Sequence, residues 1–157
     1  MDIYRITFAG HREILNHTRL EDTVEKIIRQ MLSKKEYVEI YIGRNGDFDI
    51  LVASAVKRAQ KAIGHHNSCL TLVQPYRMKD DEYYEAFYDE VIHPIPEASH
   101  PKSAITARNQ WMIDQADLLV AYVEGGRTGG ALSSLQYAQK HGVKTVNLAD
   151  EKSAEIM

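Results

Sequence analysis

The sequence predicts an α/β fold in which helices cover both faces of a mainly parallel sheet, giving a three-layer sandwich. Short apolar runs alternate along the 157 residues with longer segments whose apolar residues recur at helical spacing. Because a helical segment separates most successive strands, parallel pairing through crossovers is the economical arrangement. The content of 44% hydrophobic and 26% charged residues is typical of a globular domain.

The predicted strands share a short apolar run, and they cover residues 3–8, 38–42, 69–73, 118–123 and 144–148. Residues 91–95 are expected to form a further short extended piece. Pro94 and Pro96 place that piece at an edge or in a loop, because proline cannot donate a hydrogen bond to a central strand. Residues 97–102 are expected to be a loop.

The predicted helices share apolar residues three or four positions apart, and they cover residues 20–32, 48–63, 103–115 and 128–141. Val24, Ile27 and Ile28 show this spacing in the first helix. Gly64 and Gly142 follow two of the helices, at the position where glycine commonly ends a helix. A short helix is expected over residues 80–88.

The pattern contains no repeat or linker, so we expect one domain over residues 1–150 and a frayed tail over residues 151–157. The formal charge of −3 and the pI near 6.2 give no global basic field, which disfavours nucleic acid as a partner. No apolar run approaches the roughly 18 residues that span a bilayer. We therefore expect a cytoplasmic chain without membrane binding.

The single cysteine, Cys69, lies in an apolar run and has no partner for an intramolecular disulfide. It is expected to be a small buried hydrophobe. The seven histidines show no spacing typical of a zinc site, so no metal site is expected.

A glycine-rich segment joins a predicted strand to a predicted helix, and its glycines are Gly125, Gly126, Gly129 and Gly130. Such a loop lets the backbone approach a ligand and direct N–H groups at an anion near a helix N-terminus. Arg127 and Thr128 would add a charged contact and a hydroxyl donor. The alternative is a flexible turn, but the cluster favours a phosphate site.

A second loop, with Gly43, Asn45 and Gly46, also joins a strand to a helix. Asp47 is expected to cap that helix. Asp49 has two interpretations. Its negative charge can simply interact favourably with the positive end of the helix dipole, or it can be a functional group that accepts a hydrogen bond from a ribose hydroxyl or acts as an acid or base. Considered alone, this loop is better explained by capping.

Gly10, His11 and Arg12 follow the first strand, at the same edge of the predicted sheet as the other loops. We expect them to contribute to a binding site, although surface polar residues are an equal alternative.

Arg108, Asn109 and Met112 lie in a predicted helix, with Arg108 and Met112 on one face. That face could hold a phosphate or stack a base. The sequence slightly favours the other interpretation, in which Trp111 and Met112 lie in the core and Arg108 is solvated.

Five segments in this order resemble the SLOG superfamily, in particular its YpsA-like branch of small bacterial proteins. The segments are TFAGHR (residues 7–12), GRNGDFD (43–49), RNQWMI (108–113), GGRTGG (125–130) and YAQK (137–140). The resemblance implies a Rossmann-like fold whose loops bind nucleotides or nucleotide-derived ligands. It implies no defined cofactor beyond a nucleotide or NAD-derived ligand, and it suggests a homo-oligomer by analogy.

The same superfamily includes the LOG phosphoribohydrolases, which release a base from a nucleoside monophosphate, and DprA, which binds single-stranded DNA. The glutamate of the LOG signature has no counterpart in residues 131–134, which read ALSS. Asp49 and Glu124 are the only obvious substitutes as catalytic carboxylates, so the catalytic residues are unassigned. The favoured interpretation is binding or sensing of a nucleotide-like ligand; the alternatives are an N-glycosidase and, third, a DprA-like nucleic-acid-binding protein.

Overall fold

The computed structural model describes residues 1–97 and 100–150. The tail expected over residues 151–157 and part of the loop expected over residues 97–102 lie outside these ranges. Within them, one sheet contains six strands in the order β4-β3-β2-β1-β5-β6, and every neighbouring pair is parallel. The predicted α/β fold with a parallel central sheet is therefore confirmed.

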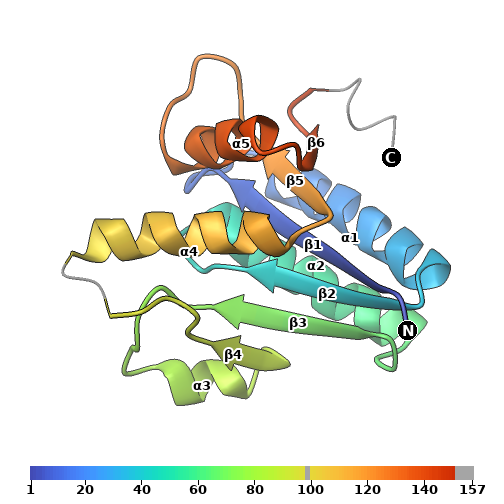
Figure 1. The fold of residues 1–157 in the computed structure, drawn as a ribbon. Coiled ribbons are helices and arrows are strands. Elements are labelled where there is room, and N and C mark those ends of the chain that lie inside the picture. Colours follow the sequence, from blue (N-terminus) through green and yellow to red (C-terminus); the bar gives the residue numbers. More distant parts are fainter. Residues whose placement is uncertain (98–99, 151–157) are drawn as a thin grey trace.

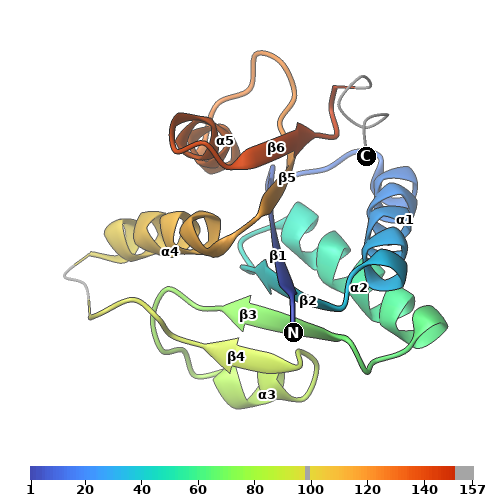
Figure 2. The same ribbon diagram turned by 45° about the vertical axis from the view of Figure 1, so that its right-hand side comes forward.

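The strands are β1 (Ile3–Gly10), β2 (Tyr37–Ile42), β3 (Ser68–Val73), β4 (Glu90–Ile92), β5 (Leu118–Tyr122) and β6 (Lys144–Asn147). The helices are α1 (His17–Lys34), α2 (Asp47–Ile63), α3 (Asp81–Glu85), α4 (Pro101–Gln115) and α5 (Gly130–Lys140). Helices α1 and α2 pack on one face of the sheet and α4 and α5 on the other, while α3 lies beside the edge strand β4 (Figures 1 and 2).

Successive side chains of the central strands point to opposite faces of the sheet, and an apolar cluster lies on each face. In β1, Ile6 and Phe8 enter the larger apolar cluster, which also contains the buried residues of α1 and α2. In β5, Leu119 and Ala121 enter a second cluster with residues of α4 and α5. The central strands are thus apolar toward both helical layers, as expected for buried parallel strands.

Two predicted helix boundaries were wrong, because the residues at the first turn and at the N-cap position determine where a helix begins. Helix α4 begins at Pro101, inside the segment expected to be a loop, because proline is well suited to the first helical turn. The ring of His100 caps this helix by accepting a hydrogen bond from the backbone N–H of Lys102. Helix α5 begins at Gly130 and not at residue 128, because Gly129 has a φ of +124°, which is not helical.

Cys69 is half-buried, so the expectation that it is a buried hydrophobe was wrong. Its neighbours Leu70 and Leu72 belong to the core against α1 and α2. Alternation along β3 points Cys69 to the opposite face, where its thiol is 3.7 Å from the carboxylate of Glu90.

The strand order reverses between β1 and β5. Strands β1 to β4 extend toward one edge of the sheet, and β5 and β6 extend toward the other. In open α/β sheets, ligands bind outside the carboxyl ends of the strands at such a reversal. The loops after β1, β2 and β5 therefore lie together at one end of the sheet, as the sequence predicted (Figure 1).

No helix among residues 1–97 and 100–150 is both long enough and apolar enough to cross a membrane.

Candidate ligand-binding site

A cavity of about 380 Å³ opens at the carboxyl ends of the central strands, between them and helices α4 and α5. Its size lies within the range of small-molecule sites. Most of the residues predicted to bind a ligand line it, namely Gly10, His11, Arg12, Asn45, Gly46, Asp49, Arg108, Asn109, Met112, Thr128, Gly129 and Gly130. Gly43, Gly125 and Gly126 are not among the lining residues.

The N-terminus of α5 faces this cavity without a cap. Gly129 occupies the N-cap position, so no described side chain caps the helix. Gly126 and Gly129 have φ values of +82° and +124°, in the region that favours glycine. The first backbone N–H groups of α5 therefore remain available, next to Gly130 and Ser134 in the cavity wall. Such a terminus suits an anion.

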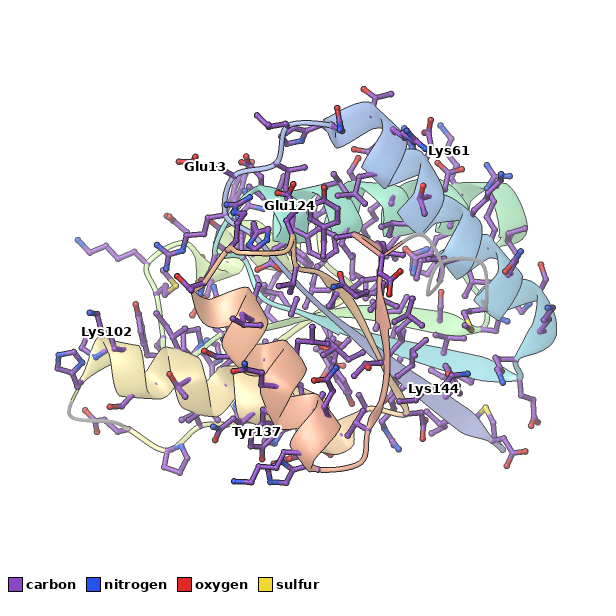
Figure 3. The ribbon with its side chains drawn as sticks, turned by 90° about the horizontal axis from the view of Figure 1, so that it is seen from above. Glu13, Lys61, Lys102, Glu124, Tyr137 and Lys144 are labelled. Atoms are coloured by element: carbon purple, nitrogen blue, oxygen red, sulfur yellow. The ribbon has the colours of Figure 1, made fainter. Side chains whose placement is uncertain are left out.

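Arg127 also lines the cavity, and it stabilises the loop that precedes α5. Its Nη1 lies 2.8 Å from Oε1 of Glu124 and 3.3 Å from the carbonyl oxygen of Glu13. Figure 3 shows Glu13 and Glu124 close together at this end of the sheet. Glu124 itself does not line the cavity. Of the two candidate carboxylates, only Asp49 is placed to meet a ligand.

His11 joins the loop after β1 to the loop after β5. Its side chain is buried, with 4% exposure, and its Nε2 accepts a hydrogen bond from the backbone N–H of Glu124 at 2.9 Å. A ring nitrogen that accepts is unprotonated, so His11 is neutral in this arrangement. Burial, together with the charge of Arg127, lowers the pKa of His11. His11 is thus a loop contact and adds no positive charge for an anion.

We expect acid to weaken this loop contact. The native pKa of His11 lies below its ordinary value of about 6.5, so below that pH the unfolded chain binds the proton more readily and stability falls as the pH falls. Gln at position 11 can still accept from Glu124 but does not titrate. Between about pH 7.5 and 5.5, wild type should lose up to about 1.4 kcal/mol more than His11→Gln in urea unfolding. Equal losses in the two proteins would show that the His11 contact is not linked to pH.

The β2–α2 loop is tied to the β1–α1 loop by backbone contacts. The N–H of Asp47 donates to the carbonyl of Arg12 at 2.8 Å, and Oδ2 of Asp47 accepts from the N–H of Ile14 at 3.2 Å. The expected capping role of Asp47 was therefore wrong, because Gly46 is the N-cap residue and Asp47 serves the neighbouring loop.

Asp49 projects from the first turn of α2 into the cavity wall. Its Oδ2 accepts a hydrogen bond from the backbone N–H of Asn45 at 3.0 Å, which fixes the side chain. Burial raises the pKa of Asp49, while this N–H and the charges of Arg108 and Arg44 act in the opposite direction. A desolvated carboxylate in a cleft is typical of functional sites.

Arg108 is buried, with 1% exposure, so the interpretation that leaves it solvated was wrong. Its Nη1 donates to the carbonyl of Val73 at 2.9 Å, and its Nε donates to Oδ1 of Asn109 at 2.8 Å. Burial lowers the pKa of Arg108, and the nearby Asp49 opposes that effect. Trp111, expected in the core, is only half-buried and lies edge-on to Tyr41.

Gly43 makes room for the Arg108 guanidinium. A Cβ at position 43 would lie 2.7 Å from Nη1 of Arg108, closer than real contacts allow. Gly43 therefore contributes to the site indirectly, by allowing a buried cation beside the cavity, and not by touching the ligand space.

The charges around the cavity favour an anion. Among the described residues that line it, three are arginines (Arg12, Arg108 and Arg127) and Asp49 is the one carboxylate. Within residues 1–97 and 100–150, no group of three or more His, Cys, Asp or Glu side chains is placed to hold a metal ion.

Several wall residues were not predicted from the sequence, among them Thr7, Ile105 and Ser134. Ser134 lies one helical turn after Gly130, so helical spacing from the glycine-rich loop could have identified it. Thr7 lies two residues before Ala9 in β1, so both point to the same face of the sheet. The position of Ile105 depends on how α4 crosses the sheet, which no local pattern records.

The fold is that of a Rossmann-like protein, and its cavity lies at the strand reversal, where open α/β sheets commonly bind ligands. No protein-family model matches the chain, and no curated protein sequence matches it. Solved structures do match. DNA processing protein A (DprA) from Streptococcus pneumoniae superposes with a TM-score of 0.65 at 13% identity, over 98% of this chain and 55% of DprA. This chain thus spans about half the length of DprA.

Two further structures cover most of both chains. The protein TM1055 superposes with a TM-score of 0.57 at 13% identity, over 94% of this chain and 79% of TM1055. The molybdenum cofactor carrier protein from Chlamydomonas reinhardtii superposes with a TM-score of 0.56 at 15% identity, over 94% of this chain and 78% of the carrier. These likenesses confirm the Rossmann-like α/β fold that the sequence resemblance implied.

Proposed function

We propose that this protein binds or senses a nucleotide or nucleotide-derived phosphorylated ligand, as a member of the YpsA-like branch. The observation that carries the proposal is the uncapped N-terminus of α5, which faces the cavity beside Arg127. Backbone N–H groups, a helix dipole and arginine together are the usual elements of a phosphate site. The cofactor carrier among the similar structures is a precedent for a small-molecule function on this fold.

The rest of the cavity suits the remainder of such a ligand. Ile105 and Met112 of α4 and Leu119 of β5 provide an apolar wall, and Asn45 and Asn109 add amide groups. Small-molecule sites commonly combine an apolar lining with a few placed polar groups. If the glycine-rich loop after β5 were only a flexible turn, there would be no reason for the loops after β1 and β2 to line the same cavity, as they do.

A second candidate function is hydrolysis of an N-glycosidic bond, and the position of Asp49 favours it. Asp49 is the one carboxylate among the described wall residues, so it is available as a general acid or base. The binding interpretation is preferred because no second carboxylate faces Asp49 across the described cavity wall, whereas glycosidases commonly use a pair.

Native mass spectrometry of the freshly purified protein tests the proposal, followed by calorimetry with AMP. We expect a co-purifying nucleotide-like mass or a measurable AMP affinity. The same samples, incubated at micromolar enzyme with AMP, CMP, GMP or NAD, should release negligible free base. Rapid release of base would favour the hydrolase, and the absence of any bound phosphorylated compound would remove both candidates.

A further inference from the structure

The cavity has two different poles at opposite sides of the central strand. The loops after β2 and β5 flank the loop after β1, because β2, β1 and β5 are neighbours in the sheet. Two strand spacings of about 4.8 Å separate those flanking loops by about 10 Å. The pole after β5 holds the N-terminus of α5, and the pole after β2 holds Asp49 and Asn45. A ligand that reaches both poles carries more than an anion.

Asp49 has one oxygen committed to the protein and one that is not. Its Oδ2 accepts from the backbone N–H of Asn45, while Oδ1 receives no hydrogen bond from any described residue. Among the described residues, only Gln60 and Asn67 have a fully buried side-chain oxygen without a partner, so Oδ1 of Asp49 is not fully buried. Because Asp49 lines the cavity, a ligand there can reach this oxygen. A carboxylate oxygen only accepts, so this position calls for a donor on the ligand.

Arg108 stabilises the charge of Asp49 without occupying that oxygen. The guanidinium is held by the carbonyl of Val73 and by Asn109, and it packs against Gly43. Among the described contacts it forms no hydrogen bond to Asp49, although its charge favours the ionised carboxylate. The charge of Arg108 thus opposes the effect of burial on Asp49, and the second carboxylate oxygen stays free to accept a hydrogen bond.

We propose that Asp49 determines specificity, and that its free oxygen accepts a hydrogen bond from a sugar hydroxyl of a ligand whose phosphate lies at the N-terminus of α5. The substrate class is then a phosphorylated sugar or a nucleotide, and not a simple anion. This inference rests on the proposed function.

The side chains around Asp49 suit a sugar hydroxyl of the ligand better than a nucleobase. The amides of Asn45 and Asn109 both donate and accept, as hydroxyl groups do, so a cluster of one carboxylate and two amides matches a polyol. An acidic residue after the second strand also binds ribose hydroxyls in other Rossmann-like folds. The aromatic side chains among the described wall residues are Phe8 and His11, and both are buried, with 2% and 4% exposure, so neither offers an open ring face on which a nucleobase could stack.

Calorimetry with inorganic phosphate, ribose 5-phosphate and AMP tests this inference on wild type and Asp49→Asn. Asparagine has the same shape and can still accept from Asn45, but it places an NH₂ group where the free acceptor was. The affinity for ribose 5-phosphate and for AMP should fall about 10- to 100-fold, the range for a hydrogen bond to a charged group. The affinity for inorganic phosphate should change by less than about threefold, because the anion pole is distant.

Asp47→Asn is the matched control. It removes the same charge from the same helix, but Asp47 does not line the cavity and contacts the Ile14 N–H instead. It should leave all three affinities unchanged.

Three outcomes would contradict the inference. If Asp49→Asn weakens the binding of AMP alone, Asp49 contacts the nucleobase and the assignment to a sugar hydroxyl is overturned. If it weakens all three probes equally or none, Asp49 is not a specificity residue, although the phosphate site stands. If wild type binds none of the probes, the proposed function itself fails.

Discussion

Gly130→Asp should weaken the binding of AMP and of inorganic phosphate at least about 100-fold, or about 2.7 kcal/mol. Gly130 is the first residue of α5 and lines the cavity, so the new carboxylate enters the space of the anion and repels it. A Cβ at this position meets no described atom within 4 Å, and the backbone is not left-handed. Because acidic residues stabilise a helix N-terminus, the fold should lose little or no stability.

Gly125→Asp provides the matched control for that experiment. Position 125 belongs to the same loop, has the same open surroundings and is not left-handed, but it does not line the cavity. Gly130→Ala separates the effect of the added Cβ from that of the charge. Isothermal titration calorimetry of the three variants gives the comparison. If Gly130→Asp binds AMP as well as Gly125→Asp does, the N-terminus of α5 is not the anion site.

Gly10→Ala should lower the free energy of unfolding by about 2–3 kcal/mol, the upper part of the range for overpacking a core. A Cβ at position 10 would lie 2.2 Å from Cγ of Phe48, which no side chain tolerates. Phe48 is fully buried at 0% exposure and stacks on Tyr122 with ring centroids 6.2 Å apart, so its ring cannot move aside without cost.

Urea unfolding of Gly10→Ala beside Gly125→Ala measures this effect, because the Cβ at position 125 enters open space. The double variant Gly10→Ala/Phe48→Leu should be more stable than the two single changes added together, since a smaller side chain relieves the overlap. Additive losses, or a Gly10→Ala protein as stable as Gly125→Ala, would mean that the contact between Gly10 and Phe48 is not tight in solution.

The fold was predictable because its signals are local. Each strand is an apolar run and each long helix repeats its apolar residues within a few positions, so the alternation is visible without any long-range information. The meeting of the Gly10, Gly43 and Gly125 loops at one end then followed from parallel pairing, since parallel strands place their carboxyl ends together.

The roles inside the site were less predictable, because they depend on partners far along the chain. The burial of Arg108 depends on the carbonyl of Val73, 35 residues away, and on the absence of a side chain at Gly43. The neutral state of His11 depends on a backbone N–H 113 residues away. The sequence suggested a binding residue at position 11 and slightly favoured a solvated arginine at position 108, and only the packed structure reveals a neutral acceptor and a buried cation there.

The first strand of the chain lies in the middle of the sheet, and its two neighbours reach it at very different stages of synthesis. The pairing with β2 joins residues 34 apart, whereas the pairing with β5, which begins with Ile6 and Leu118, joins residues 112 apart. As the chain leaves the ribosome, β1 to β3 can assemble first by local crossovers, with one edge of β1 exposed. Contacts of such high sequence separation form late because closing a long loop costs entropy. We therefore expect the nascent protein to acquire its binding cavity only once β5 and α5 have been synthesised, and a bound ligand to slow the reopening of the β1–β5 junction.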